Sequence, residues 1–308
     1  MRIIHAAKEL NPGSRKVCVA IGVFDGVHLG HQQIIRQTIA DARQQEGVAL
    51  VITFDRHPNS VVAPDRTPLL IYSLPQKLRV IRSLGTDATF LITFDRVFSQ
   101  IPADRFILEL TRDLGHVHSI CVGSAFTFGH KRGGNVDLLK TLGGELKFIV
   151  HSLASVSLDG QVVSSTRIRE AIGTGNLDAA SQMLGRTYSL AGEVVHGDGL
   201  GRQLGFPTAN VETSGLMLPP NGVYAVHVQA GDQLHRAVLN IGHRPTMATA
   251  AVRPQVEAHL LDFDGDLYEQ EIEMIFSQKL RDEQKFPSRE KLIEQIHRDI
   301  DQARKIFE

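Results

Sequence analysis

The sequence contains little that would mark a secreted, membrane-spanning or nucleic-acid-binding protein. It has only two cysteines, Cys18 and Cys121, and each lies in an apolar stretch without the spacing of a metal site or a disulfide framework. We therefore expect both to be core thiols of a protein in a reducing compartment. The 33 basic and 34 acidic residues give a formal net charge of −1, so the basic excess that is typical of nucleic-acid binders is missing.

Long hydrophobic runs are also missing. No apolar run reaches the roughly 18 residues that cross a bilayer, and the first residues, MRIIHAAKEL, lack the apolar core of a signal peptide. The expected location is the cytoplasm, with neither a membrane nor a nucleic acid among the partners, and a homo-oligomer stays an open alternative. The 308 residues exceed the ~100–200 of a typical domain, so two domains are expected.

The first half of the chain has the pattern of a parallel sheet covered by helices. From residue 17 to about 150, short apolar runs alternate with segments of helical spacing, as right-handed βαβ units require. The runs are almost continuously apolar, which is typical of strands buried on both faces. We therefore expect an α/β domain over residues 1–182. Its predicted strands occupy residues 17–24, 48–54, 88–94, 119–123 and 147–153.

Two of these runs end alike, in VITFD at residues 51–55 and LITFD at residues 91–95. Two strands of one sheet that end at the same edge give this similarity without a duplication. We therefore expect both segments to reach one edge of the sheet.

The second half, residues 183–308, has the pattern of an all-β domain. Helical spacing disappears, and short alternating strands are separated by turns that contain Gly, Pro and Asn. This pattern predicts an antiparallel sheet or a closed barrel. A C-terminal helix follows, with Ser288 as its expected N-cap, and we expect it to pack across the barrel. The predicted strands occupy residues 222–230, 235–242, 255–262 and 271–278.

The stretch GVFDGVHLGH follows the first predicted strand and opens a helix. At this position a helix N-terminus presents unpaired N–H groups and the positive end of its dipole to an anion. Gly22, Gly26 and Gly30 allow close backbone approach to a phosphate, and His28 and His31 can donate hydrogen bonds to phosphoryl oxygens. Nucleotidyl transfer needs little more than such charge stabilisation. The alternative is two surface histidines at a turn.

A second candidate site lies in GDGLGRQLGFPTANV, residues 197–211. Four glycines fall within nine residues and precede the run Pro207-Thr208-Ala209-Asn210. Glycines can wrap nucleotide phosphates, and a Thr208 hydroxyl with an Asn210 amide oxygen suits Mg²⁺. The alternative is a glycine-rich hairpin without a ligand.

Together these stretches resemble one protein family. GVFDGVHLGH is similar to the HxGH signature of nucleotidylyltransferases and to the adenylyltransferase domain of bacterial bifunctional riboflavin kinase/FAD synthetases. GRQLGFPTAN resembles the signature of riboflavin kinases. The resemblance covers nearly the whole chain, because further matches follow in the family's order. They are TFDRHP, VGSAFTFGHKRGG, VVSSTRIREAI, LPPNGVYAV, LNIGHRPTM and LRDEQKF.

The resemblance implies two activities. A Rossmann-like first domain would transfer AMP from ATP to FMN, giving FAD and pyrophosphate, and a Greek-key barrel would phosphorylate riboflavin to FMN. Riboflavin, FMN and ATP would be the small-molecule partners, and both steps would use Mg²⁺. Two alternatives remain. One is a riboflavin kinase whose first domain transfers nucleotidyl groups poorly or to another acceptor, and the other is a flavin carrier without turnover.

The resemblance also assigns the sites. Without the resemblance, SSTRIREAI would be interpreted only as the start of a helix. A carboxylate in the middle of a strand, such as Glu257, is usually solvated, but in the family Glu257 matches the catalytic glutamate. The implied catalytic residues are Glu257, His28 and His31. The implied ATP and phosphate ligands are Gly22, Phe24, Asp25, Gly30, Ser165, Thr166, Arg169, Gly197, Gly199, Gly201, Arg202, Gly205 and Pro207. The implied flavin contacts are His57, Phe126, Phe128, Arg281 and Phe286, and the implied Mg²⁺ ligands are Thr208 and Asn210.

The chain departs from the family pattern at three positions. Arg56 stands where the family commonly has Pro, Ala125 where it has Asp or Asn, and Glu269 where it has Gly. Loss of a polar side chain at Ala125 implies weaker use of FMN, and Glu269 puts the geometry of its turn in question.

Overall fold

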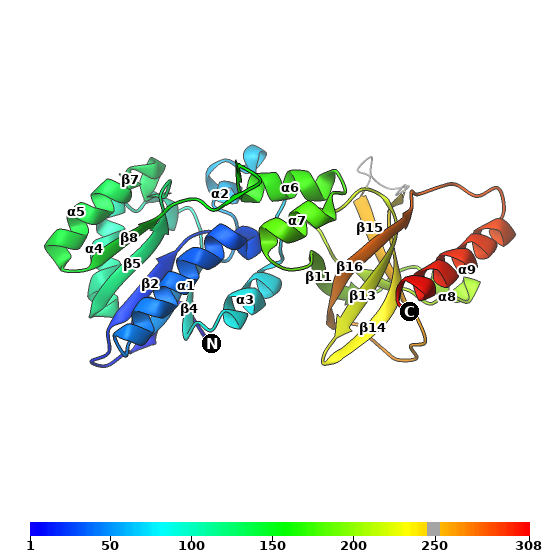
Figure 1. Ribbon diagram of the computed structural model, residues 1–308, viewed down its shortest axis with the longest axis horizontal. Helices are drawn as coiled ribbons and strands as arrows, with labels where there is room; N and C mark the ends of the chain where they lie inside the picture. Colours follow the sequence, from blue (N-terminus) through cyan, green and yellow to red (C-terminus); the bar gives the residue numbers. More distant parts are fainter. Residues whose placement is uncertain (245–252) are drawn as a thin grey trace. The chain divides into compact units, whose positions relative to one another are not determined.

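The computed structural model describes residues 1–244 and 253–308, which form two compact units, Met1–Arg167 and Ile168–Glu308 (Figure 1). The PTM part of LNIGHRPTM lies outside the described residues. The boundary that the sequence predicts near residue 183 falls at the end of helix α7 (Leu177–Leu184), shortly before strand β11 (Ser189–Val195).

The first unit contains a six-stranded parallel sheet in the order β1-β4-β3-β2-β5-β8. The predicted Rossmann-like α/β fold is confirmed, and all five predicted strands are present. The edge strand β1 was not predicted. The strands are β1 (Arg2–Ile4), β2 (Val17–Ile21), β3 (Val48–Phe54), β4 (Ala88–Ile92), β5 (Val117–Gly123) and β8 (Ile149–Leu153).

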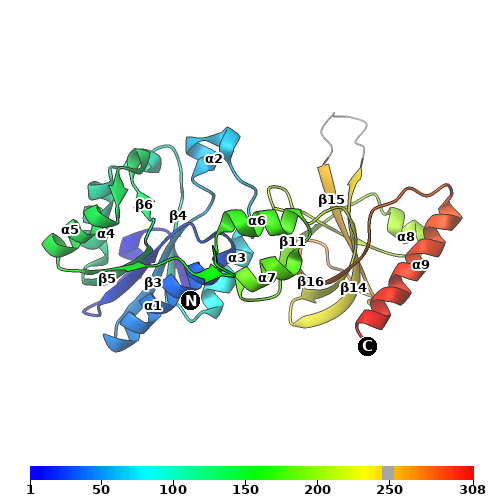
Figure 2. The same ribbon diagram turned by 45° about the horizontal axis from the view of Figure 1, so that its top comes forward.

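Helices cover both faces of this sheet, which explains why its strands are apolar throughout (Figure 2). In β2, Val17 and Val19 belong to one buried cluster, and Cys18 and Ala20 belong to the other. Helices α4 and α5 contribute to the first cluster, and α1 and α3 contribute to the second. The longer helices are α1 (Leu29–Gln44), α3 (Leu74–Ser83), α4 (Ala103–Leu114), α5 (Val136–Leu146) and α6 (Ser165–Gly173), which crosses into the second unit.

Short elements complete the first unit. They are η1 (Ala7–Leu10), η2 (Asp25–Val27), α2 (Asn59–Val62), η3 (Pro64–Arg66), η4 (Phe98–Gln100), β6 (Thr127–Phe128), η5 (His130–Arg132), β7 (Gly134–Asn135), β9 (Ser157–Leu158) and β10 (Gln161–Val162).

The two cysteines are core residues, as expected. Both Cys18 and Cys121 are fully buried, and neither forms a disulfide. Burial raises the pKa of the Cys121 thiol to about 12. The thiols therefore behave as small apolar side chains within the sheet.

The second unit is a closed antiparallel barrel in the order β11-β12-β15-β14-β13-β16 (Figure 1). The predicted barrel is confirmed with its four predicted strands, while β11 and β12 were not among the predicted ranges. The barrel strands after β11 are β12 (Ala209–Val211), β13 (Gly222–Ala230), β14 (Gln233–Arg244), β15 (Arg253–Leu260) and β16 (Glu271–Arg281), and the short helix α8 (Leu200–Leu204) precedes β12.

The C-terminal helix α9 (Arg289–Ile306) packs against the barrel, as expected. The Ser288 hydroxyl accepts a hydrogen bond from the Lys291 amide at 3.3 Å and caps the helix. Helix α9 contacts β13, β14 and β16. Among the described residues, no helix is both long enough and apolar enough to cross a membrane.

The three departures from the family pattern lie in turns. Glu269 has a φ of +62°, so its backbone keeps the left-handed conformation that favours glycine, although an L side chain is disfavoured there. Ala125 is exposed in the turn after β5, and Arg56 forms an ion pair with neighbouring Asp55 at 3.0 Å.

Candidate active sites

The two histidines of GVFDGVHLGH lie together at the N-terminus of α1, at the carboxyl edge of the sheet. His28 is the N-cap of the helix, and its Nδ1 accepts a hydrogen bond from the His31 amide at 3.4 Å. A neutral His28 in this role carries its proton on Nε2. The two rings stack with centroids 3.5 Å apart and an interplanar angle of 20°. Two potential donors are therefore held beside the positive end of a helix.

Gly30 lies close to the His28 ring. A Cβ atom at Gly30 would lie 3.3 Å from His28 Cε1 and 3.4 Å from Nδ1. Similarly, a Cβ at Gly22 would lie 2.8 Å from the Phe24 ring. These glycines make room for aromatic rings within the turn itself.

Phe24 and Asp25 shape this turn from inside. Phe24 is fully buried, and its ring meets the His31 ring edge-on at 5.3 Å. The Asp25 carboxylate is 5% exposed and accepts hydrogen bonds from the amides of Ile71 at 3.0 Å and Tyr72 at 3.4 Å. Both side chains face the protein interior, and their contact with ATP stays a prediction.

The start of helix α6 reaches the same turn. Ser165 Oγ donates a hydrogen bond to the Asp25 carbonyl oxygen at 3.0 Å, and Thr166 beside it is exposed. The Ser164 hydroxyl accepts from the Arg167 amide at 3.3 Å and caps the helix. Arg169 follows Ser165 by about one turn of α6. Ser165 therefore contacts the turn that carries the two histidines, and the contact of this segment with ATP stays a prediction.

Phenylalanine side chains gather near the carboxyl ends of β3, β4 and β5. The rings of Phe126 and Phe128 stack at 5.2 Å with an interplanar angle of 14°, and Phe54 meets Phe94 edge-on at 5.3 Å. A partly buried aromatic surface of this kind suits a planar ring system. Sequence reasoning missed four members, although the paired VITFD and LITFD endings signalled two of them. The four are Phe54, Phe94, Phe98 and Phe106.

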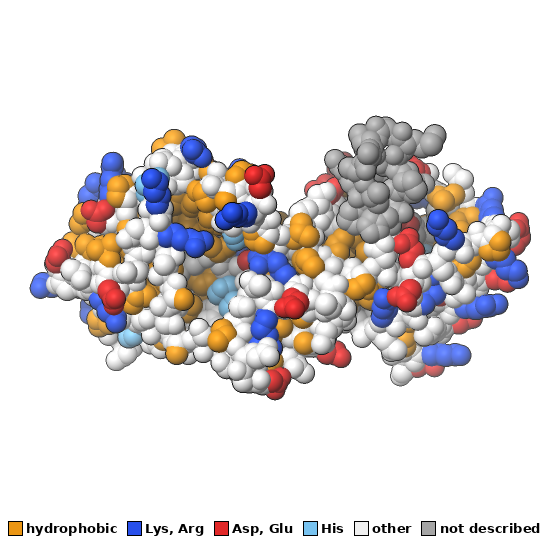
Figure 3. All heavy atoms as spheres, turned by 90° about the horizontal axis from the view of Figure 1, so that it is seen from above, with side chains coloured by type: hydrophobic (Ala, Val, Ile, Leu, Met, Phe, Trp, Pro, Cys, Tyr) orange, Lys and Arg blue, Asp and Glu red, His pale blue; other side chains and the backbone are white. Residues whose placement is uncertain are grey.

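His57 lies at the same edge, directly after β3. Its Nδ1 accepts a hydrogen bond from the Asn59 amide at 3.1 Å. Figure 3 shows histidine and hydrophobic side chains together in a hollow of the first unit.

Lys77 on α3 is a buried cation that sequence reasoning missed. It is 7% exposed, and its Nζ donates hydrogen bonds to Phe54 O at 2.8 Å, Thr53 Oγ1 at 3.3 Å and Val23 O at 3.4 Å. Lys77 therefore ties the end of β3 to the segment after β2. Burial lowers its pKa from 10.5 to about 8, although the nearby carboxylates of Asp25 and Asp55 oppose the change.

Replacing Lys77 with methionine should change how stability depends on pH. The folded-state pKa lies below the unfolded one, so the unfolded chain binds more protons between pH 8 and 10.5. The cost of burying the charge is fully present below pH 8 and disappears as the pH rises to 10.5. The free energy of unfolding of the wild type should therefore rise relative to Lys77→Met, by up to roughly 3 kcal/mol.

Urea unfolding followed by circular dichroism at several pH values measures this difference. The exposed Lys140 on α5 offers a matched control. For Lys140→Met, the difference in free energy of unfolding from the wild type should not change with pH. A flat difference for Lys77→Met as well would contradict the assigned burial cost.

The second candidate site is a cavity of about 390 Å³ in the barrel unit. It lies between the outer face of β12, β14 and β15, the segment that contains α8, and helix α9. Seven predicted site residues line it, whereas Gly197, Arg202, Gly205 and Pro207 are not among the lining residues. The seven are Gly199, Gly201, Thr208, Asn210, Glu257, Arg281 and Phe286.

Glu257 faces this cavity from the middle of β15. Its neighbours Val256 and Ala258 are buried inside the barrel, so the alternation of the strand turns Glu257 to the outer face. There it is partly buried rather than fully solvated. The register pairs Glu257 with Asn210 on β12 and with Asn240 on β14. Asn240 also lines the cavity and was missed.

Arg281 and Phe286 form another part of the cavity wall. The Arg281 guanidinium binds the Asp299 carboxylate through Nε at 3.0 Å and through Nη2 at 2.8 Å. It also lies 5.6 Å from the centre of the Phe286 ring. Because Asp299 is on α9 and almost fully buried, the pair fixes α9 to β16.

Two family models match the chain. The FAD synthetase model matches residues 11–167, and the riboflavin kinase model matches residues 184–307. The chain is 38% identical to the "bifunctional riboflavin kinase/FMN adenylyltransferase" of Escherichia coli strain K12, over 100% of this chain and 98% of that protein. The chain belongs to this bifunctional family.

Other members of the family are similarly close. The relative from Haemophilus influenzae is 35% identical, over 100% of this chain and 99% of its own length. The relative from Pseudomonas fluorescens is 36% identical, over 99% of this chain and 97% of its own length. A crystal structure described as a macrolide-efflux protein from Streptococcus pneumoniae superposes with a TM-score of 0.82, at 28% identity and 99% coverage of each chain.

The residues that the family resemblance assigns to Mg²⁺ fit a hard cation. Asn210 Oδ1 accepts one hydrogen bond, from Gln255 Nε2 at 2.9 Å, and an amide oxygen has a second lone pair for a cation. Thr208 lines the same cavity. Among the described residues, no group of three or more His, Cys, Asp or Glu side chains could hold a metal. With Thr208 and Asn210 as ligands, a cation would complete its shell with phosphate and water oxygens, as Mg²⁺ does.

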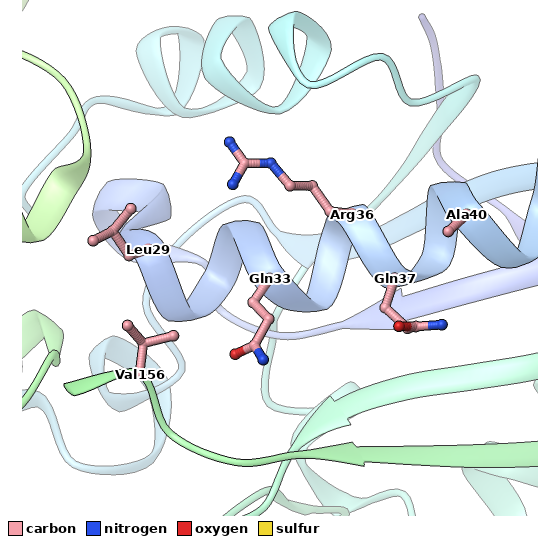
Figure 4. A pocket seen from close by; sticks show the side chains of 6 residues that line it. All are labelled: Leu29, Gln33, Arg36, Gln37, Ala40 and Val156. Atoms are coloured by element: carbon pink, nitrogen blue, oxygen red, sulfur yellow. The ribbon is translucent and has the colours of Figure 1, made fainter.

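A further hollow lies along the outer face of α1 (Figure 4). The resemblance to the bifunctional family assigns no role to this hollow. Gln33 and Gln37 point to one side of the helix and Arg36 to the other, while Leu29 lies near Val156. The hollow contains none of the predicted site residues.

Proposed function

We propose that this protein phosphorylates riboflavin to FMN with ATP at the barrel site and adenylylates FMN to FAD with ATP, with release of pyrophosphate, at the first site. The observation that supports the proposal is that the two family models match successive parts of the chain, with His28 and His31 in the first match and Glu257 in the second.

For adenylyl transfer, the first site supplies stabilisation of developing negative charge. His28 and His31 lie at the N-terminus of α1, where N–H groups and the helix dipole favour phosphate. Ser165, Thr166 and Arg169 on α6 would bind the triphosphate of ATP, and Arg169 can hold phosphate oxygens bidentately. The surface around Phe126 and its neighbouring rings would bind the isoalloxazine of FMN.

For riboflavin phosphorylation, Glu257 would accept the proton of the riboflavin 5′-hydroxyl as that oxygen attacks the γ-phosphate. Thr208 and Asn210 would hold Mg²⁺, which would offset charge on the phosphates when bound. The glycines at 197, 199, 201 and 205 would let the backbone approach those phosphates. Arg281 and Phe286 would border the flavin.

We place the domain boundary near residue 183, giving domains 1–182 and 183–308. The start of the riboflavin kinase match at residue 184 supports this division. The cytoplasmic location stays a prediction, and the free, buried thiols of Cys18 and Cys121 are consistent with it.

Incubating the protein with riboflavin, ATP and Mg²⁺ tests the proposal, with flavins resolved by chromatography. We expect FMN and then FAD, and FAD from FMN supplied directly. FMN without FAD from either substrate would favour the kinase-only alternative. Flavin binding without ADP or pyrophosphate release would favour the carrier.

A further inference from the structure

One glutamine links two of the groups proposed for the kinase step. Gln255 is on β15, two residues before Glu257, so both side chains project from the same face of the strand. Gln255 Nε2 donates a hydrogen bond to Glu257 Oε1 at 2.8 Å and another to Asn210 Oδ1 at 2.9 Å. Asn210 is on β12 and is paired with Glu257 in the backbone register. A single amide nitrogen therefore joins groups from two strands.

These two hydrogen bonds fix the orientation of the Gln255 amide. An NH₂ group has two hydrogens, one for each acceptor, whereas a rotated amide would set its own oxygen against two oxygens. All three side chains are partly exposed and line the same cavity.

The orientation of Asn210 follows from the same contacts. Its Oδ1 faces Gln255, and its Nδ2 lies against Gly197, where a Cβ atom would come within 2.2 Å. The glycine at 197 thus admits the Asn210 amide, and the hydrogen bond from Gln255 requires the oxygen, not the nitrogen, to face Gln255.

We propose that Gln255 is a positioning residue for riboflavin phosphorylation, which holds the Glu257 carboxylate and the Asn210 amide oxygen in fixed relative positions. The inference rests on the proposed kinase function. Without the two N–H donors, the link between the two acceptors is lost. The base then spends less time aligned with the substrate hydroxyl, and the cation ligand is less well oriented.

Gln255→Met in the full chain tests this inference, because methionine keeps the length of the side chain and removes both donors. We expect kcat of FMN formation to fall roughly 10- to 100-fold, the usual scale for loss of a partner of a metal ligand. The Mg²⁺ concentration for half-maximal rate should rise, while KM for riboflavin should change by less than about threefold, since Gln255 is not a proposed flavin contact. Gln255→Glu, which replaces the donors with acceptors, should lower kcat at least as much.

Two controls separate positioning from general damage. Gln278→Met changes an exposed glutamine on β16 and should leave both activities unchanged. In an Asn210→Ala background, Gln255→Met should no longer raise the Mg²⁺ requirement, because the two residues act on the same ligand.

The outcomes distinguish this inference from the proposed function. Wild-type kinetics and Mg²⁺ response in Gln255→Met would overturn the inference alone. Parallel loss of FAD formation from supplied FMN would indicate a general folding role and would also overturn it. No FMN formation by the wild-type protein would overturn the proposed function, and this inference with it.

Discussion

Glu257→Gln is expected to reduce the rate of riboflavin phosphorylation by about 10²–10⁴-fold, the usual scale for loss of a general base. Glutamine keeps the shape of the side chain and can occupy the same place between Asn210 and Asn240 in the sheet. It cannot accept the hydroxyl proton. Riboflavin binding should survive, because the proposed flavin contacts Arg281 and Phe286 lie on other segments. Steady-state FMN formation and flavin binding measured by fluorescence test both parts.

FAD formation from supplied FMN serves as the internal control for this variant, because His28 and His31 lie in the other unit. The exposed Glu193 on β11 gives a matched substitution, and Glu193→Gln should retain both activities. If Glu257→Gln phosphorylated riboflavin at the wild-type rate, Glu257 would be an ordinary polar residue of the barrel surface.

Replacing either His28 or His31 with alanine should abolish FAD formation from FMN and leave FMN formation from riboflavin largely intact. Loss of one preorganised donor to a developing charge lowers the rate about 10²–10³-fold. This applies to either residue, because the rings of His28 and His31 stack at one location. Chromatography of reactions started with FMN, and separately with riboflavin, measures the two steps.

His28→Ala also removes an N-cap, which costs about 1 kcal/mol of stability in typical helices. His28→Asn is therefore the sharper variant, because an asparagine oxygen can accept the hydrogen bond from the His31 amide while the imidazole is lost. The exposed His116, in the turn before β5, provides a control substitution to alanine. Equal loss of both activities in the His28 and His31 variants would show that the two units do not act independently.

The sequence analysis predicted strands in which many residues contribute to the apolar pattern. The long apolar runs of the first unit and the alternating runs of β13 to β16 were recognised because each strand repeats its signal over several residues. Strands β1 and β12 have three residues each and were missed, since so short a segment carries no period; β11 was missed as well, although it has seven residues. Their pairing is decided by neighbours far away in the chain.

The site was predictable only where a motif is continuous in the sequence. Glycine and histidine spacing identified the turn before α1, but nothing local marks Gln255, which is on the same strand as Glu257, or Asn240, which the strand register brings to Glu257. Lys77 was missed for a similar reason. A lysine on a helix is usually solvated, and its burial depends on oxygen atoms at the ends of β2 and β3.

Asp25 has a consequence for the order in which the protein folds. Its carboxylate accepts hydrogen bonds from the amides of Ile71 and Tyr72, which follow it by 46 and 47 positions in the chain. Its carbonyl oxygen accepts a hydrogen bond from Ser165, which follows it by 140 positions. Contacts of such separation require closure of long loops and form late compared with local helices. During synthesis, the turn before α1 leaves the ribosome early, but its hydrogen bond from Ser165 cannot form until the chain has been made as far as α6. A chain that stalls before α6 would thus contain the complete histidine sequence without this contact.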